Sequence, residues 1–294
     1  MTIDAQNVLW GSDMPAEGND LLCRAGEQVT VQIAPAAGYR GIHVFLSDPA
    51  VSLSISEGND AVSFLMPYAP LTLTLTADKL YTVTMDTAGG DPIRPIQYTV
   101  ESEAFLLPTP VRTGYIFLGW TGEGITEPQK TIEIPQGSTG DRTYTANWQV
   151  IEYTITLDTN GGPVVSPIKY TVEDSVTLPI PPDRPGYEFA GWTLDGSGQF
   201  PSTPMIIPKG STGDRIYKAE WRVASYTITY VSHGKAYNWV QYTINNQVYF
   251  GTPEEDPSYY LPGYTFVGWK IDGVEGTPRS YMLPKGSYGN RTAT

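Results

Sequence analysis

The thiol and imidazole groups of this sequence are few: one cysteine, Cys23, and two histidines, His43 and His233. A catalytic thiol needs a nearby base, and these histidines are the imidazoles that could serve. However, His233 lies in Val231-Ser-His-Gly-Lys, where a hairpin turn is predicted, and His43 lies in Ile42-His-Val-Phe, where an exposed strand is predicted. One cysteine also excludes an intrachain disulfide and a multi-cysteine zinc site. We therefore expect no catalytic residues and no cofactor, so that the protein is not an enzyme.

Three short motifs resemble ligand-binding loops. The run Gly210-Ser-Thr-Gly-Asp-Arg resembles a phosphate loop, but it lacks the Gly-Lys-Ser/Thr ending and the strand-loop-helix setting. Asp195-Gly-Ser-Gly and Asp272-Gly-Val-Glu-Gly could place carboxylates around calcium, yet neither follows the twelve-residue ligand pattern. Ordinary turns account for all three, and we expect no metal site.

The charge balance limits the partners. The chain has 18 basic and 31 acidic residues and a formal net charge of −13, so it repels phosphate backbones and anionic lipid surfaces. Nucleic acid is not an expected partner. Apolar runs long enough to span a membrane are absent from the sequence, and Met1-Thr-Ile-Asp-Ala-Gln-Asn lacks the charged and apolar regions of a signal peptide. The sequence is thus either cytosolic or a piece of a longer protein.

The end of the sequence favours the second alternative. Trp148 and Trp221 each follow an arginine, Arg142 or Arg215, by six residues, but the sequence stops three residues after the matching Arg291. The expectation is a piece whose last strand is truncated and whose signal and anchor lie outside it.

The elements that carry these residues are repeated. Gly-Tyr-x-Phe-x-Gly-Trp occurs at Gly114, Gly186 and Gly263, inside segments of about seventy residues that restart at Tyr81, Tyr153 and Tyr226. Each segment also carries Pro-x-Gly-Ser-x-Gly-(Asp/Asn)-Arg. Because a single active site would need one unique constellation, residues found in every copy are first expected to be folding residues.

Within a repeat the apolar period is two. Tyr153, Ile155 and Leu157 share one face of a predicted strand, a turn follows at Asp158-Thr-Asn-Gly-Gly, and Ile168, Tyr170 and Val172 form its hairpin partner. A proline-rich covering segment leads to an aromatic strand that starts at Tyr187. Strict alternation there places Phe189 and Gly191 on one face and Trp192 on the other, and the glycine leaves room for close approach of an aromatic ring or a neighbouring backbone. A turn or one short helical turn after Pro208 precedes the closing strand with Tyr217, Ala219 and Trp221.

The first eighty residues form another small β module, with predicted strands at Val29, Val31 and Ile33 and at Leu71, Leu73 and Leu75. We predict four modules in tandem: residues 1–79, 80–152, 153–225 and 226–294. Spacers of about four residues restrict swinging. With modules of roughly 30 Å, an elongated monomer of roughly 120 Å is expected.

The order Tyr-Thr-(Ile/Val)-Thr, Asn-Gly-Gly, Pro-Gly-Tyr-x-Phe-x-Gly-Trp and x-Ala-x-Trp resembles the Listeria-Bacteroides repeat, also called the internalin B-repeat family, from about Leu80 to Thr294. Residues 18–78 resemble its divergent relatives more loosely. The resemblance implies a mainly β, α+β, β-grasp-like fold with antiparallel strands and at most one short helix, used in tandem in extracellular, bacterial cell-surface proteins. It carries over no catalytic residues. The third repeat departs most, and Tyr237, Trp239, Tyr249, Tyr259 and Tyr260 enrich it in aromatics.

Two classes of function remain. The first is a non-catalytic spacer, stalk and adhesion segment of a cell-surface protein, secreted or attached to the cell wall. The second is a carbohydrate- or protein-binding module in which exposed aromatics stack on sugars or anchor a host or cell-surface partner. Non-repeated aromatics are the candidates for ligand binding, namely Trp10, Trp239, Tyr259 and Tyr260.

Overall fold

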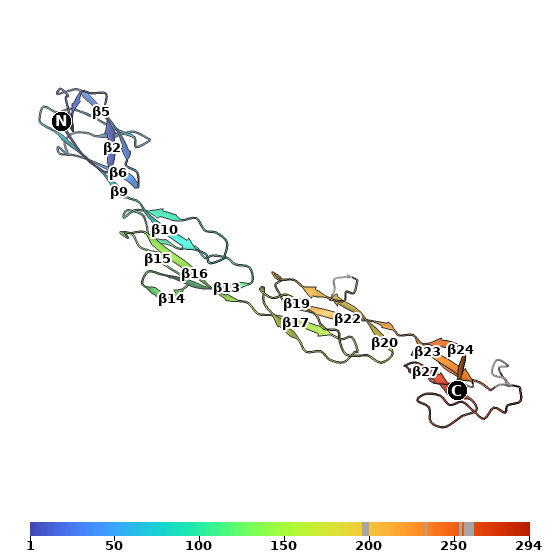
Figure 1. Cartoon of the computed structure of the whole chain (residues 1–294). Coiled ribbons are helices and arrows are strands. Elements are labelled where there is room, and N and C mark those ends of the chain that lie inside the picture. The colour runs from blue at the N-terminus through green and yellow to red at the C-terminus, as the bar shows by residue number, and fades with distance from the viewer. Residues whose placement is uncertain (196–199, 233, 253–254, 256–261) are drawn as a thin grey trace. The chain divides into compact units, whose positions relative to one another are not determined.

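The computed structural model describes residues 1–195, 200–232, 234–252, 255 and 262–294. The chain divides into two compact units, residues 1–149 and 150–294. Within the described ranges every regular element is a strand (Figure 1), which confirms a mainly β fold. The segment after Pro208, predicted as a turn or one short helical turn, forms a turn in which the Ser211 amide donates to the Pro208 carbonyl at 3.2 Å, and the α+β character is not confirmed. The β-grasp likeness and the four module boundaries stay predictions.

Residues 1–79 form two sheets around one core. The first has the order β3-β4-β1-β9-β6 and the second the order β2-β5-β8-β7. The predicted strands are found as β5, with Val29, Val31 and Ile33 buried, and as β9, with Leu73 and Leu75 buried, whereas the buried Leu71 precedes β9. The strand bounds are β1 Thr2–Gln6, β2 Val8–Gly11, β3 Ala16–Glu17, β4 Asp20–Leu21, β5 Gln28–Pro35, β6 Tyr39–Leu46, β7 Ser54–Ile55, β8 Ala61–Leu65 and β9 Thr72–Lys79.

Repeats 1 and 2 (residues 80–152 and 153–225) share one plan: a main sheet and a two-stranded ribbon. The main sheets have the orders β11-β10-β16-β13-β14 and β18-β17-β22-β20, and the ribbons are β12-β15 and β19-β21. The strands of repeat 1 are β10 Tyr81–Asp86, β11 Ile96–Tyr98, β12 Phe105–Leu106, β13 Tyr115–Gly122, β14 Ile125–Gln129, β15 Glu133–Ile134 and β16 Arg142–Val150. Those of repeat 2 are β17 Tyr153–Asp158, β18 Ile168–Tyr170, β19 Val176–Thr177, β20 Tyr187–Leu194, β21 Ile206–Ile207 and β22 Arg215–Val223.

Repeat 3 (residues 226–294) keeps part of this plan. Its main sheet has the order β24-β23-β27, and its ribbon is β25-β26. The strands are β23 Tyr226–Ser232, β24 Lys235–Tyr242, β25 Val248–Phe250, β26 Tyr281–Leu283 and β27 Arg291–Ala293. Each repeat, like residues 1–79, encloses its own cluster of buried apolar side chains.

The hairpin that opens each repeat is confirmed, although its second strand in repeat 2 ends at Tyr170 and does not include the predicted Val172. Tyr153 pairs with Tyr170 across the β17-β18 hairpin, and their rings lie 5.6 Å apart. The same pairing occurs in the other repeats between Tyr81 and Tyr98 and between Tyr226 and Tyr242. The alternation of Thr with Ile or Leu produces it, because one face of the strand is buried and the other faces solvent.

Two details of the prediction need correction. The sheets are mixed, because the opening and closing strands of each repeat, such as β17 and β22, run parallel. The aromatic strand is also not strictly alternating, since a register shift lies between Phe189 and Gly191. This bulge turns Phe189 and Trp192 into the same core, where their rings pack edge to face at 5.4 Å. Gly191, at φ 135°, allows this geometry.

Candidate functional site

The repeated aromatic motif builds the core. Trp120, Trp192 and Trp269 are at most 3% exposed. In repeat 2 the indole Nε1 donates to the Pro179 carbonyl at 2.8 Å, and in repeat 3 it donates to the Gly251 carbonyl at 2.8 Å. The repeated tryptophans are therefore folding residues, as their repetition predicts, and they present no ring to a ligand.

The tryptophan of the closing strand is hydrogen-bonded to the hairpin turn. Trp221 donates from Nε1 to the Thr159 carbonyl at 2.8 Å, and its ring packs 5.5 Å from that of Phe189. A Cβ on Gly162 would lie 2.7 Å from the Trp221 ring, so the second glycine of Asn-Gly-Gly makes room for the indole. Trp148 makes the same bond to Thr87 at 2.9 Å in repeat 1.

The glycine-rich motif that resembles a phosphate loop is a clamp between strands. The Asp214 carboxylate accepts from the Thr154 amide at 2.7 Å, and the Tyr170 hydroxyl donates to the Gly213 carbonyl at 2.5 Å. Both bonds tie the turn to the opening hairpin. The equivalent pairs are Asp141 with Thr82, Asn290 with Thr227, Tyr98 with Gly140 and Tyr242 with Gly289.

An arginine that precedes the aromatic motif was not singled out from the sequence. The Arg184 guanidinium stacks 3.9 Å above the Tyr187 ring and donates from Nη1 to the Asn160 carbonyl at 2.9 Å. Arg112 repeats both contacts with Tyr115 and Ala88. The sequence shows this arginine as Arg-x-Gly-Tyr in two repeats. Its contacts also stabilise the fold.

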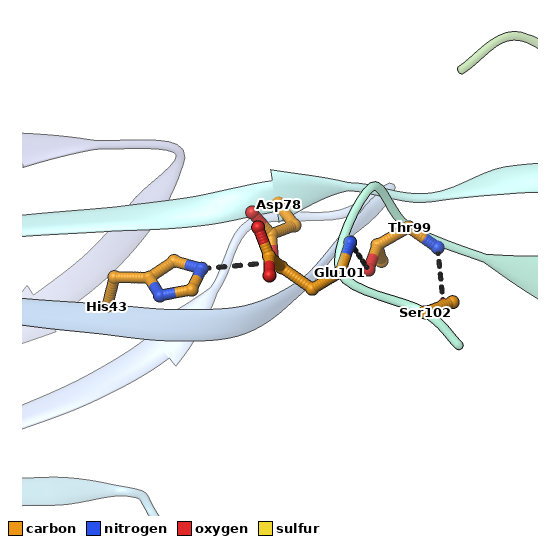
Figure 2. Close-up of polar contacts among 5 residues, drawn as sticks. All are labelled: His43, Asp78, Thr99, Glu101 and Ser102. Atoms are coloured by element: carbon orange, nitrogen blue, oxygen red, sulfur yellow. Dashed lines mark hydrogen bonds and ion pairs between the residues drawn. The ribbon is translucent and has the colours of Figure 1, made fainter. Parts of the chain in front are cut away.

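His43 and Cys23 each have contacts within residues 1–79. His43 lies on β6, as predicted, with its Nε2 3.0 Å from Asp78 Oδ2 (Figure 2). Ser102 lies away from His43 in Figure 2, and its hydroxyl accepts from the Thr99 amide at 2.9 Å. Cys23 is half-buried against the core of residues 1–79. His233 lies outside the described residues.

The acidic turns also have structural partners. Asp272 accepts from the Thr292 amide at 2.8 Å, and its carbonyl accepts from Arg291. The loop after Asp195 falls outside the described ranges. In the part of the chain that the structure describes, groups of three or more metal-ligating side chains are absent. The same part contains no helix that could cross a membrane.

The third repeat carries an exposed aromatic surface. Trp239, on β24, is 65% exposed and pairs with Thr229, whereas the next pair, Ile228 and Val240, faces the core. Alternation along the strand therefore places Trp239 on the face of the sheet opposite the core. Tyr237 is 41% exposed, and its ring lies 6.3 Å from that of Tyr230.

The other aromatic candidates behave differently. Trp10 is half-buried and packs against the core of residues 1–79. Tyr249 is 49% exposed and donates its hydroxyl to Glu255 at 2.9 Å, and this hydrogen bond raises the pKa of Tyr249 above its ordinary value. Tyr259 and Tyr260 lie outside the described residues.

Comparison with known proteins establishes the class to which these repeats belong. The family model of the Listeria-Bacteroides repeat domain matches residues 81–147, 153–212 and 226–284. The chain therefore belongs to this family, with three tandem copies, as the motif order predicts.

Two relatives come from Evansella cellulosilytica. The chain is 25% identical over 212 residues, or 71% of its length, to a protein whose name describes it as a Gly-rich membrane protein. It is 25% identical over 198 residues, or 66% of its length, to a second one named as a membrane protein. The chain spans only 24% and 28% of the lengths of these relatives.

Proposed function

We propose that residues 1–294 are a non-catalytic spacer and adhesion segment of a protein at the bacterial cell surface. The membership in a bacterial repeat family and the membrane-protein names of two relatives support a location at the cell envelope. The proposed orientation is extracellular, with a signal and an anchor supplied by other parts of the protein.

One observation carries the proposal. The paired polar groups that recur in every copy, an Asp or Asn with a Thr amide and a Tyr hydroxyl with a Gly carbonyl, bond inside their own repeat. In repeat 2 these bonds form the Asp214 and Tyr170 clamp, and the Trp221 bond, which repeat 1 shares through Trp148, also serves the fold. Repeated side chains that stabilise their own repeat are what a spacer segment needs.

Small-angle scattering on the whole chain tests the spacer role. Four modules in file, each about 30 Å across, predict a maximum dimension of about 120 Å and a monomer. A compact particle would contradict a spacer. Adhesion is tested separately, by measuring retention of beads coated with the chain on host cells and on bacteria that display surface glycans and proteins.

The absence of catalysis is tested with hydrolase, transferase and oxidoreductase substrate screens. We expect no turnover above the buffer. Robust activity that His43→Ala or His233→Ala abolishes would overturn this part of the proposal, because those imidazoles are the chain's candidate bases.

A second candidate function is carbohydrate or protein binding by repeat 3. The exposure of Trp239, 65% on a sheet face lined by Thr229, favours it. A glycan array followed by titration should then give a ligand whose binding is lost in Trp239→Ala. Tyr288→Ala, which removes another exposed aromatic, should retain binding.

A further inference from the structure

The long hairpin of repeat 3 adds a position to the sheet that repeat 2 does not use. In repeat 2, the pairing of β18 with β17 stops at Ile168 opposite Ile155. In repeat 3, β24 continues along β23 and places Trp239 opposite Thr229. On the other side of Thr229, the paired residue is Thr292 on β27. A line of three side chains therefore crosses the strands of this sheet.

This line lies on the face of the sheet opposite the core. Ile228 and Tyr230, which flank the middle residue of the line on β23, are both buried. The Tyr230 ring lies 5.6 Å from that of Phe250, so the ribbon β25-β26 packs on the core side of the sheet. Because side chains alternate along a strand, the line points the other way. Trp239, its largest member, is 65% exposed.

A carboxylate extends the line beyond β27. The exposed Asp272 donates its amide to the Thr292 carbonyl at 3.0 Å, and its Oδ2 accepts from the Thr292 amide at 2.8 Å. We call Trp239, Thr229, Thr292 and Asp272 the outer row. Three strand spacings of about 4.8 Å make the outer row about 14 Å long, which suits a short chain of linked groups better than a single small molecule.

The residue types of the outer row indicate what it can bind. An exposed indole offers a flat apolar surface, and the two threonine hydroxyls can both donate and accept hydrogen bonds. A pyranose ring presents the matching chemistry, with C–H groups on its face and hydroxyls around its rim. The carboxylate of Asp272 and the formal net charge of −13 repel anionic ligands, so the charge favours a neutral sugar.

We propose that the outer row is a binding site for a neutral, β-linked oligosaccharide of pyranoses whose hydroxyls are equatorial. Equatorial hydroxyls leave the C–H face of the ring flat, so that it can stack on Trp239, while Thr229, Thr292 and Asp272 bond to the rims of the following rings. A protein partner would need apolar neighbours that shield the indole from water, whereas the cross-sheet neighbours of Trp239 are hydroxyls. This inference rests on the second candidate function and names its ligand class and the residues that act with Trp239.

The test titrates the whole chain with two neutral hexamers, cellohexaose and chitohexaose, which carry glucose and N-acetylglucosamine respectively. Titration calorimetry should give saturable binding of at least one of them, and the two arms show whether an N-acetyl group is accepted. The matching hexamer of glucuronic acid should bind about tenfold or more weakly, because each ring adds a negative charge. In NMR spectra, the shifted signals should include the Trp239 indole N–H and the Thr229 and Thr292 amides.

Variants of the outer face separate recognition from folding. Trp239→Ala should weaken binding of the neutral hexamer about tenfold or more, and Trp239→Phe, which keeps an aromatic face, should recover most of it. Thr292→Val keeps the shape of the side chain without the hydroxyl and should weaken binding about threefold to tenfold. Ile216→Ala is the matched control, because Ile216 pairs with Thr156 in repeat 2 as Thr292 pairs with Thr229, and it should leave binding unchanged. Hydrogen exchange at Trp269 must stay as slow as in the wild type.

Asp272→Asn tests the charge preference. The variant should bind the neutral hexamer more weakly, because a charge-assisted hydrogen bond is lost, and the glucuronic acid hexamer more tightly, because a repulsion is removed. Opposite changes for the two ligands cannot come from a general loss of folding.

The outcomes that overturn the proposal differ from those that overturn the second candidate function. Binding that Trp239→Ala abolishes but that neither Thr292→Val nor Asp272→Asn alters would remove the outer row and leave Trp239 as a binding residue. Binding that is insensitive to Trp239→Ala would overturn both. Failure of both neutral hexamers to saturate would overturn the ligand class, and a protein captured by the wild type but not by Trp239→Ala would replace it.

Discussion

Repeats 2 and 3 begin alike and end differently. Both open with a Tyr-Thr-Ile-Thr strand, pair it with a hairpin partner through two tyrosines, and run it parallel to a later strand. They diverge after the opening strand. The hairpin partner β18 has three residues, whereas β24 has eight. The opening strand, which the two repeats share, is determined by the local alternation of polar and apolar residues. The later strands, in which they differ, depend on which distant segment pairs with them.

The turn sequence explains the divergence. In repeat 2, Asn160 adopts φ 49° and Asp158 accepts from its amide at 2.8 Å, so that the chain leaves the sheet in a loop that receives Trp221. Repeat 3 replaces this turn with Ser-His-Gly, and β23 and β24 stay paired up to Ser232 opposite Lys235. The longer hairpin places Trp239 on an exposed surface. One local change therefore alters both the core and the surface.

The largest expected effect comes from the tryptophans. Trp192→Ala should destabilise repeat 2 by about 3–5 kcal/mol, because Trp192 is 1% exposed and its loss leaves a cavity. Trp239→Ala, at 65% exposure, should change stability by less than about 0.5 kcal/mol. Denaturant unfolding with hydrogen exchange read separately at each repeat measures both. Similar losses of unfolding free energy in the two variants would show that Trp239 is a folding residue.

The bulge glycine should give the next largest effect. A Cβ on Gly191 would lie 2.8 Å from the Ser202 amide nitrogen at φ 135°, so Gly191→Ala should cost about 3 kcal/mol. Gly210→Ala is the matched control, since φ is 91° but no atom lies within 4 Å of its Cβ, and it should cost about 1 kcal/mol. Thermal unfolding of the two variants checks the difference. Equal shifts would mean that backbone conformation alone matters.

Adding a tryptophan-containing closing strand to repeat 3 should make repeats 2 and 3 more alike. Appending Ala-Glu-Trp-Arg-Val after Thr294 should stabilise repeat 3 by about 2 kcal/mol through burial of the indole. Slower hydrogen exchange at residues 264–268 and slower proteolysis between Tyr281 and Thr294 are the measurements. An Ala-Glu-Ala-Arg-Val extension is the control. If neither extension changes protection, the alignment of the third repeat with the first two is wrong.

The smallest effect concerns acid stability. The Thr171 hydroxyl and amide both donate to the Asp174 carboxylate, and these bonds lower the pKa of Asp174 below its ordinary value of 3.8. Because the folded pKa is the lower one, its stabilisation is present above pH 3.8 and is lost as the pH falls through the folded pKa.

Repeat 3 provides the comparison for this group. Asn246 accepts the same two bonds from Thr243 and does not titrate as an acid. Asp174→Asn should therefore reduce the acid sensitivity of repeat 2 slightly, toward that of repeat 3. Unfolding midpoints measured between pH 5 and pH 2 check this. An unchanged pH dependence would show that the Asp174 turn contributes nothing to it.

Part of the fold was predictable because it is local. Alternation of Thr with Ile or Leu indicated β17, and the hairpin partner with Tyr170 followed from the turn residues between them. Gly191 was predicted to leave room for an aromatic ring or a neighbouring backbone, and the structure places the backbone of Ser202 there. The β-bulge beside Gly191 could not be predicted from the alternation of apolar residues. A bulge is an extra residue in one strand relative to its partner, so it depends on how the two strands pair.

The candidate site was predictable only in outline. The sequence identified Trp239 as a non-repeated aromatic, but its exposure depends on the pairing of β24 with β23. The contact between His43 and Asp78 joins residues 35 positions apart, and neither motif nor spacing indicated it. The spacing of Arg184 and Tyr187 is repeated in the sequence, but only the folded turn shows that the guanidinium stacks on the ring.

The sequence by itself determined the tandem repeats, the family, the strand-rich local structure and the assignment of the tryptophans of the repeated motif to the core, because each depends on short-range pattern or on repetition. The tertiary structure alone decided the parallel pairing of β17 with β22 and the shared core position of Phe189 and Trp192. These features depend on which distant strand supplies the hydrogen bonds and the neighbouring side chains, and no local period encodes that choice.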